Sequence, residues 1–252
     1  MEEQQDATDV LLDAWELFVS AVDGGRYAEH AGVVTAVSGA PVPTMNGVWL
    51  RRADANVQDV AAALDEVATA GVPFCLQGRP GAAGAVGAAA EARGLKPAGD
   101  VPLRVRPGRV RPETADGELV VEQLVPEDAR LHAEVVAEGF GLPVEVARAL
   151  LSPRLLRAPG VRAYVGRIGD RAVVTGLGAT VRDAVAVFNV ATAEPFRRRG
   201  YGAAVTARAV ADGLDAGASW AMLQSSAMGL GVYERLGFCT VERWSLWVSA
   251  AE

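Results

Sequence analysis

The feature that most constrains this chain is an apolar stretch that runs into a short basic turn and then into a helix start with two glycines. Residues 184–192 are almost wholly apolar, which predicts a central strand covered on both faces. The turn ends in Arg197–Gly202, which reads Arg-Arg-Arg-Gly-Tyr-Gly, and apolar spacing predicts a helix over 201–214. A strand, a short turn and a helix in this order indicate an α/β protein.

Composition narrows the class of protein. The 252 residues suffice for one large domain or two ordinary ones, and a hydrophobic share of 50% with 28 glycines favours a folded chain. The net charge of −7 argues against a general nucleic-acid binder, which normally has a basic face. A local basic cluster can still hold an anionic ligand.

The ends and the cysteines indicate a cytoplasmic protein without a metal. The N-terminus is acidic and shows no secretory signal. Residues 32–50 carry no charge until Arg51, but glycines, prolines and an asparagine interrupt them, so we expect strand, turn and strand and no membrane span. Cys75 and Cys239 lack metal-ligand spacing.

Periodicity divides the chain into two parts. In the first we expect helices at 8–22, 57–68 and 82–93 and strands at 72–76 and 101–105. In the second we expect helices at 126–140, 201–214 and 230–236 and strands at 118–124, 161–168, 172–180, 184–192, 220–224 and 243–248. The charged, proline-containing residues 107–117 are predicted to link domain 1–106 to domain 118–252; phosphate binding by the arginines there is the alternative.

The turn at Arg197–Gly202 suits a pyrophosphate. Backbone N–H groups in the first turn of a helix have no intrahelical acceptor, and the helix dipole adds partial positive charge there. Glycines let a bulky anion approach, and three arginines add full charges. A Walker loop is excluded because Ala203 follows the last glycine, and the dinucleotide fingerprint lacks its third glycine. The alternative is a solvated arginine cluster before a helix cap.

Two motifs together resemble the GNAT superfamily of N-acetyltransferases. Arg197-x-x-Gly200-x-Gly202 matches the family's loop after a strand ending in Val190-Ala191-Thr192, and residues 233–238 resemble its later helix and turn. Pro195 stands one position later than expected. The resemblance covers residues 118–252. It implies the GNAT fold, an α/β fold with a mixed, mostly antiparallel central sheet flanked by helices, and transfer of acetyl from acetyl-CoA to a primary amine by direct attack in a ternary complex.

The resemblance also implies individual roles. The backbone of 190–192 would pair with the pantetheine arm, amides from 198 to 203 would hold the pyrophosphate, and the arginines would also meet the 3′-phosphate of the adenosine. Ser226 would make a polar contact to the cofactor, with a simple helix-cap role as the alternative. The implied CoA-binding residues are Val190, Ala191, Thr192, Arg197, Arg198, Arg199, Gly200, Tyr201, Gly202, Ala203 and Ser226.

Tyr233 is implied as the acid that protonates the departing thiolate, since a phenol with a pKa of about 10 keeps its proton at neutral pH. The alternative is a core aromatic packed on Leu236. Glu134 and Glu138 are the candidate general bases, and ordinary solvent-facing glutamates explain them equally well. His132 is a poorer candidate because its sequence neighbours suggest no partner.

The first part of the chain repeats the order of the second. Gly94 follows Asn46 by 48 positions, and Gly237 follows Asn189 by the same 48. The position of the anion loop, however, holds residues 51–56 without a glycine. We therefore expect a degenerate GNAT-like half that lacks the cofactor loop; a coincidental α/β domain is the alternative.

The acceptor is expected to be a small-molecule or peptide amine, in a protein that binds neither nucleic acid nor membrane and could form a homodimer. A non-catalytic acyl-CoA-binding or regulatory protein on the same fold is the alternative function. Fold resemblance does not choose the acceptor.

Overall fold

The computed structural model describes residues 2–108, 117–226 and 229–249, with side chains from Gln5 onward. They form two compact units, Met1–Leu103 with Thr240–Glu252, and Arg104–Cys239. Most of the predicted linker 107–117 falls on 109–116 and lies outside the described residues. The units divide the chain differently from the predicted domains, because residues 240–252 belong with the first unit.

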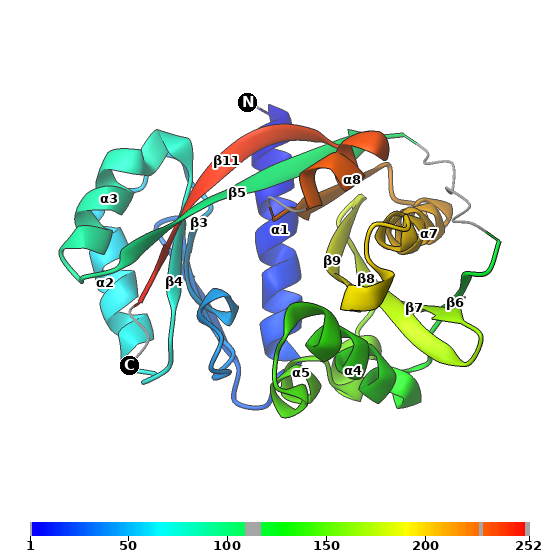
Figure 1. Ribbon diagram of the computed structural model, residues 1–252. Helices are drawn as coiled ribbons and strands as arrows, with labels where there is room; N and C mark the ends of the chain where they lie inside the picture. Colours follow the sequence, from blue (N-terminus) through cyan, green and yellow to red (C-terminus); the bar gives the residue numbers. More distant parts are fainter. Residues whose placement is uncertain (1, 109–116, 227–228, 250–252) are drawn as a thin grey trace. The chain divides into compact units, whose positions relative to one another are not determined.

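The first unit is a sheet with helices on both faces (Figure 1). Its strand order is β1-β2-β3-β4-β11, in which β3 and β4 are parallel and the other neighbours antiparallel. Its elements are α1 (Glu2–Ser20), β1 (Arg26–His30), β2 (Val33–Val37), a 3-10 turn (Pro43–Met45), β3 (Asn46–Leu50), α2 (Val57–Ala68), β4 (Cys75–Gly78), a 3-10 turn (Pro80–Ala82), α3 (Ala83–Glu91), β5 (Lys96–Pro107), which enters the second unit at Arg104, and β11 (Cys239–Val248), which leaves it at Thr240.

Alternation along β3 explains the two helical layers of this unit. Val48 and Leu50 belong to one apolar cluster with Leu64 of α2 and Val86 of α3. Trp49 points to the opposite face, where its ring lies 5.1 Å from that of Trp15 on α1. Successive side chains of a strand point to opposite faces, so three consecutive residues hold α1 on one side and α2 with α3 on the other.

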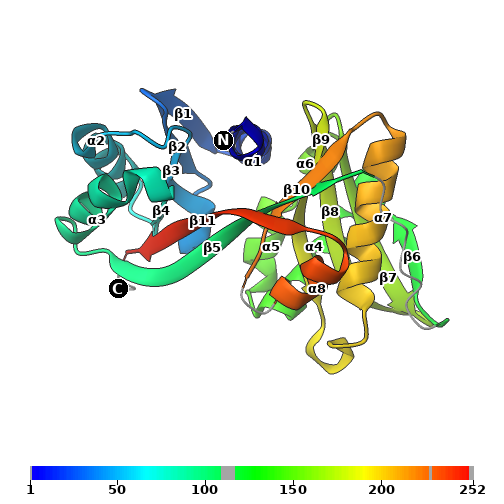
Figure 2. The same cartoon turned by 90° about the horizontal axis from the view of Figure 1, so that it is seen from above.

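The second unit is also a mixed sheet between helices (Figure 2). Its strand order is β10-β9-β8-β7-β6, with β5 beside β10; β9 and β10 are parallel, and β9–β8, β8–β7 and β7–β6 are antiparallel. Its elements are β6 (Val120–Gln123), a 3-10 turn (Pro126–Asp128), α4 (Ala129–Phe140), α5 (Val144–Leu150), α6 (Pro153–Leu156), β7 (Val161–Ile168), β8 (Arg171–Val181), β9 (Ala184–Thr192), a 3-10 turn (Glu194–Phe196), α7 (Tyr201–Asp215), β10 (Trp220–Gln224) and α8 (Leu230–Arg235).

Adjacent residues of β8 separate the helical layers of this unit. The side chain of Thr175 contacts His132 of α4, whereas a Cβ at Gly176 would lie 2.7 Å from Val205 of α7. Helices α4 and α7 therefore cover opposite faces of the sheet. The missing side chain at Gly176 is what lets α7 approach β8 so closely.

Most predicted elements are present with shifted ends, and the departures have physical causes. The helix at 57–68 and the strand at 220–224 match α2 and β10. Strand β1 was not predicted because it is a largely exposed edge strand, Arg-Tyr-Ala-Glu-His, without an apolar pattern. The short helices α5 and α6 were also missed. The predicted mixed, mostly antiparallel sheet flanked by helices is confirmed.

The last strand, β11, completes the sheet of the first unit. Ser245–Val248 pair with Gly78–Cys75 of β4 in antiparallel register. The Nε of Arg79, at the end of β4, donates to both carboxylate oxygens of Glu242 at 3.0 and 3.2 Å, and both side chains are almost fully buried. Trp244 Nε1 donates to the same carboxylate at 2.6 Å. A buried ion pair thus ties the end of the chain to the first unit.

We predict that Glu242→Gln lowers the free energy of unfolding by about 3 kcal/mol, because it leaves the Arg79 charge buried without a counter-charge. Urea unfolding followed by fluorescence measures the effect. Asp54→Asn is the matched control, since it breaks an exposed pair with Arg52 and should leave the midpoint unchanged. Equal midpoints for Glu242→Gln and the unmodified protein would contradict this role of the pair.

Candidate anion-binding site

The candidate site begins where β9 and β10 stop pairing. Paired positions join Ala184–Ala186 of β9 to Trp220–Met222 of β10. Strand β10 ends at Gln224, and 187–192 of β9 have no pairing with β10 among the described residues, although this segment still pairs with β8 on its other side. The backbone edge of β9 that faces β10 is therefore free to pair with an extended ligand along 187–192.

A β-bulge lies in the same part of β9. Leu177 pairs with Phe188 and Thr175 with Ala191, so two residues of β9 oppose Gly176 alone. Asn189 has φ +54°, in the left-handed region that L-residues rarely adopt. A bulge bends its strand and increases the local twist. The bulge at Asn189 lies three residues after Ala186, the last residue of β9 that pairs with β10.

The turn after β9 leaves the start of α7 uncapped. Arg198 and Gly200 both have positive φ, +63° and +80°, and Gly200 is the N-cap residue. No described side chain caps this helix, and its first turn carries no acidic residue. The N–H groups of residues 201–203 have no acceptor within the helix. Because the side chains of Tyr201 and Ala203 are buried in the core, these residues offer a ligand their backbone only.

The two glycines of the turn leave open space beside those amides. No described atom lies within 4 Å of a Cβ built at Gly200, and at Gly202 the nearest atoms, on Val190 and Thr192, are at 3.5 and 3.7 Å. The Gly200 conformation, with φ +80°, disfavours any other residue. Gly200 thus has open space beside it, whereas a Cβ at Gly202 would make ordinary van der Waals contacts.

The three arginines of the turn differ in their roles. The Arg197 guanidinium donates to the carbonyls of Thr192 at 3.2 Å and Gly139 at 2.8 Å, so it ties the turn to β9 and α4. Arg199 stacks over Phe196 with its Cζ 5.7 Å from the ring centroid, and Arg198 is exposed. Arg171 of β8 lies over the same ring at 4.9 Å, a contribution that the sequence did not reveal. Arg197 thus supports the turn, whereas the exposed side chains of Arg198 and Arg199 are accessible to an anion.

Tyr233 stands on α8 and is held by apolar neighbours. Its ring meets that of Phe238 edge to face at a centroid distance of 6.0 Å, and it packs on the cluster that includes Ala203 and Leu223. Burial raises the pKa of the Tyr233 phenol to about 12, and the charge of Arg104 opposes that rise. The phenol is therefore protonated at neutral pH. These contacts fit the core-aromatic interpretation of Tyr233, and the raised pKa makes its phenol a weaker acid than that of a free tyrosine.

The predicted polar contact at Ser226 has a buried neighbour. Ser226 is exposed, and its carbonyl accepts from the amide of Gly229 at 3.1 Å. Ser225, directly after β10, is only 3% exposed, and its hydroxyl has no hydrogen-bond partner among the described residues. A buried hydroxyl without a partner is unusual in folded proteins. Sequence inspection gave no reason to prefer this serine.

Both predicted bases are engaged by arginines. Glu134 accepts from Arg130 at 2.9 Å and from Arg148 at 2.7 Å, and the pKa of its carboxyl is lowered by these two hydrogen bonds, that from Arg130 first. Glu138 accepts from Arg171 at 2.8 Å, the same arginine that covers Phe196. The lowered pKa makes Glu134 a weaker base than a free glutamate.

His132 lies on the buried face of α4 and is fully buried. The sequence suggested no partner for it, but the structure gives it a hydrogen-bond partner. Its Nδ1 lies 2.6 Å from the hydroxyl of Thr175, and that hydroxyl donates to the carbonyl of Tyr164 at 2.7 Å. Thr175 has one hydroxyl hydrogen, so it must accept from Nδ1–H. Nε2 then carries a lone pair without a described partner, and burial lowers the pKa of the ring to about 4. His132 is thus a neutral core residue that joins α4 to β8.

The corresponding place in the first unit is closed. Strands β3 and β4 pair at Gly47–Trp49, the positions that the repeat aligns with 190–192. A Cβ at Gly47 would lie 2.2 Å from the carbonyl oxygen of Cys75, so the two strands are in close contact. The N-cap of α2, Asn56, accepts from the amide of Asp59 at 2.9 Å, and Asp59 adds an acidic group in the first turn. An anion would meet a capped, acidic helix start here.

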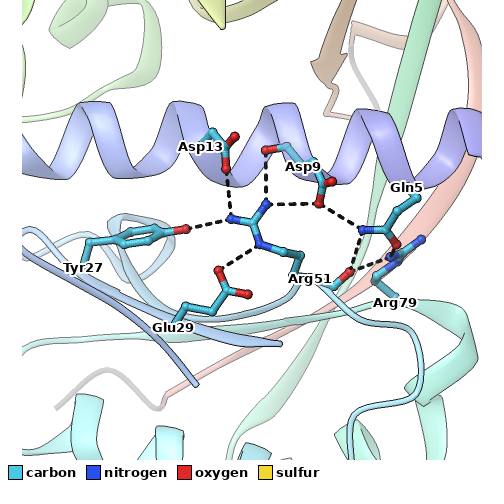
Figure 3. A network of polar contacts seen from close by, with 7 residues as sticks. All are labelled: Gln5, Asp9, Asp13, Tyr27, Glu29, Arg51 and Arg79. Atoms are coloured by element: carbon cyan, nitrogen blue, oxygen red, sulfur yellow. Dashed lines mark hydrogen bonds and ion pairs between the residues drawn. The ribbon is translucent and has the colours of Figure 1, made fainter. Parts of the chain in front are cut away.

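Arg51, the first residue after β3, turns into the first unit (Figure 3). Its guanidinium donates to Asp9 at 3.1 Å, Asp13 at 3.0 Å and Glu29 at 2.9 Å, and to the hydroxyl of Tyr27 at 3.3 Å. Its carbonyl accepts from Arg79 at 2.7 Å. Where the second unit presents basic side chains on an open turn, the first unit uses its arginine to anchor α1 to β1 and β3.

The described residues hold no group of three or more His, Cys, Asp or Glu placed to bind a metal ion. In the part of the chain that the structure covers, no helix is both long and apolar enough to cross a membrane.

Comparison with known proteins shows similarity in structure alone. No family model and no curated protein matches the sequence. A GCN5-related N-acetyltransferase from Kribbella flavida aligns with a TM-score of 0.72 and 17% identity over 98% of this chain and 96% of that one. One from Sphaerobacter thermophilus gives 0.64 and 16% over 86% and 76%. A tandem GNAT protein from the clavulanic acid biosynthesis pathway gives 0.57 and 14% over 87% and 79%. Identities this low establish the fold and leave the reaction open.

The buried His132 predicts a pH dependence of stability. Its folded-state pKa of about 4 lies below the ordinary value of about 6.5, so the unfolded chain binds a proton that the folded chain refuses. The contribution of neutral His132 to the free energy of unfolding is fully present above pH 6.5. It falls by about 3 kcal/mol as the pH drops toward 4. His132→Gln should remove that part of the pH dependence. Identical curves of unfolding free energy against pH for both proteins would contradict the assignment.

Proposed function

We propose that this protein, which has the GNAT fold, is an acetyl-CoA-dependent N-acetyltransferase with one working site, in its second unit. The observation that carries the proposal is the combination of a free backbone edge on β9 with an uncapped, glycine-open helix start directly after it. An extended arm that ends in a pyrophosphate matches this pair of features in order. CoA has that shape and charge.

The CoA fit rests on backbone groups. The pantetheine arm would pair with the free edge of β9 along 187–192, as an added strand does. The pyrophosphate would accept from the N–H groups of 201–203, where the helix dipole favours negative charge. Arg198 and Arg199 would serve the remaining phosphate, since Arg197 is already bound to two backbone carbonyls. The unpartnered Ser225 hydroxyl would find an acceptor or donor on the arm.

The chemistry needs a donor for the leaving thiolate. A neutral amine attacks the thioester carbonyl, the C–N bond forms, the C–S bond breaks, and CoA leaves as a thiolate. Tyr233, protonated at neutral pH, gives its proton to that sulfur. The proton lost by the amine goes to a base; of the two predicted glutamates, Glu138 has one arginine partner and Glu134 has two, so we retain Glu138 as the residue to test.

The acceptor is proposed to be the amine of a small molecule or peptide. The first unit is proposed to be a degenerate copy, since its strands pair where the ligand arm would enter and its helix start is capped by Asn56. One CoA per chain follows from this proposal.

We predict that Gly202→Glu abolishes acetyl-CoA binding while the protein stays folded. A Cβ at this position would make only ordinary van der Waals contacts, and it lies in the first turn of α7, where a glutamate favours the helix but would repel the pyrophosphate. Isothermal titration calorimetry measures the loss. Gly84→Glu is the matched control, because Gly84 is open and also second in its helix, α3, in the first unit. Undiminished binding by Gly202→Glu would place the CoA site elsewhere.

We predict that Tyr233→Phe lowers kcat about a hundredfold and leaves the Kd for acetyl-CoA within a few fold, because it removes a proton donor but keeps the packing. Release of free CoA across a panel of amines is the measurement. Tyr164→Phe is the control, since that buried hydroxyl donates to Asp212 at 3.1 Å and has no role in the site. If acetyl-CoA binds and no amine is acetylated, the protein is a non-catalytic acyl-CoA-binding or regulatory module.

A further inference from the structure

A buried arginine on β5, Arg104, forms hydrogen bonds with the helix that carries Tyr233. Arg104 is 2% exposed and belongs to the second unit. Its Nη1 donates to the carbonyl of Leu230 at 2.8 Å and its Nη2 to the carboxylate of Glu234 at 3.0 Å. Residues 230 and 234 are one turn apart on α8, so the guanidinium spans the turn that contains Tyr233.

The hydrogen bonds that Arg104 forms do not offset the cost of burying its whole guanidinium. Its Nε is buried and has no described hydrogen-bond partner, which is costly for a charged group. An uncharged side chain of similar length could pack against α8 without this cost. Besides its ion pair with the exposed Glu234 side chain, a cation at this position places a buried positive charge against the helix that carries Tyr233.

We propose that Arg104 is a positioning and charge-stabilising residue for the Tyr233 acid: its guanidinium fixes α8 and stabilises the phenolate that forms when Tyr233 gives its proton to the departing thiolate. The proton passes from the phenol oxygen to sulfur, the thiolate becomes a thiol, and the negative charge comes to rest on Tyr233. The catalytic consequence rests on the proposed function. The electrostatic coupling between Arg104 and Tyr233 does not.

Among the charged groups near Tyr233, Arg104 has the largest effect on the pKa of the phenol. Glu234 and Arg235 are exposed on α8, where water screens them, and the side chain of Glu234 is 64% exposed against 2% for Arg104. Arg106 of β5 donates to the carbonyl of Leu236 at 2.6 Å and to those of Pro107 and Gly108, beyond the end of α8. Apolar side chains from α7, β9 and β10 pack with Tyr233, and the charge that acts on its phenol is that of Arg104.

The test replaces Tyr233 with 3,5-difluorotyrosine, whose more acidic phenol titrates where the protein is folded, and follows its ¹⁹F resonance against pH in the full-length protein without ligand. Arg104→Gln should raise the titration midpoint, because the cation favours phenolate. Arg104→Lys should leave it near the unmodified value. Glu234→Gln, at an exposed position, should shift it the opposite way from Arg104→Gln or leave it unchanged.

Arg106→Gln is the matched control for loosening of α8, since it also removes an arginine that holds this helix. It should not move the midpoint. Equal midpoints in Arg104→Gln and the unmodified protein, or equal rises in Arg104→Gln and Arg106→Gln, would overturn the proposal. If Arg104→Gln does not fold, the outcome rests on Arg104→Lys, whose midpoint would have to stay low.

Turnover gives a second readout if the protein acetylates an amine. Arg104→Gln should lower kcat on the order of tenfold, with the KM for acetyl-CoA little changed. Difluorotyrosine at 233 should restore most of that loss, because it supplies acidity that the missing cation supplied. A midpoint shift without any turnover would leave the coupling standing and count against the proposed function alone.

Discussion

The candidate site depends on the end of pairing between β9 and β10. If these parallel strands paired along their whole length, both edges of β9 would be occupied by neighbouring strands. An extended ligand could then not pair with β9 before the turn that leads into α7. The bulge at Asn189, opposite Gly176, coincides with this divergence. The same strand then leads into a turn whose helix start lacks a capping side chain. The proposed pairing with a ligand arm and the proposed anion site thus both lie at one local departure from regular sheet structure.

The first unit shows what the same order of elements does without that departure. There the parallel pair β3–β4 stays in register, Asn56 caps α2, and Arg51 binds the carboxylates of Asp9, Asp13 and Glu29. Polar groups that would serve a ligand in one unit are satisfied internally in the other. The polar groups of the first unit are thus bonded to one another without a ligand.

Local pattern predicted much of this structure, and contacts distant in sequence account for the rest. The helix Val57–Ala68 followed from its apolar spacing, and the open turn before α7 from its glycines. The role of Arg197 depends on Gly139, 58 positions away, and that of Arg104 on Leu230, 126 positions away. Arg104 lies in the predicted strand 101–105, three residues before the predicted linker, and nothing in the neighbouring sequence indicated that its side chain is buried. No window along the chain contains the partner that decides such a residue's role.

The cocrystal structure with CoA tests the central claim most directly. We predict one CoA per chain, with its pyrophosphate within hydrogen-bond distance of the backbone nitrogens of residues 201–203 and its pantetheine arm beside 187–192 of β9. CoA bound at the start of α2, or at both helix starts, would contradict a single site built on the divergence of β9 and β10.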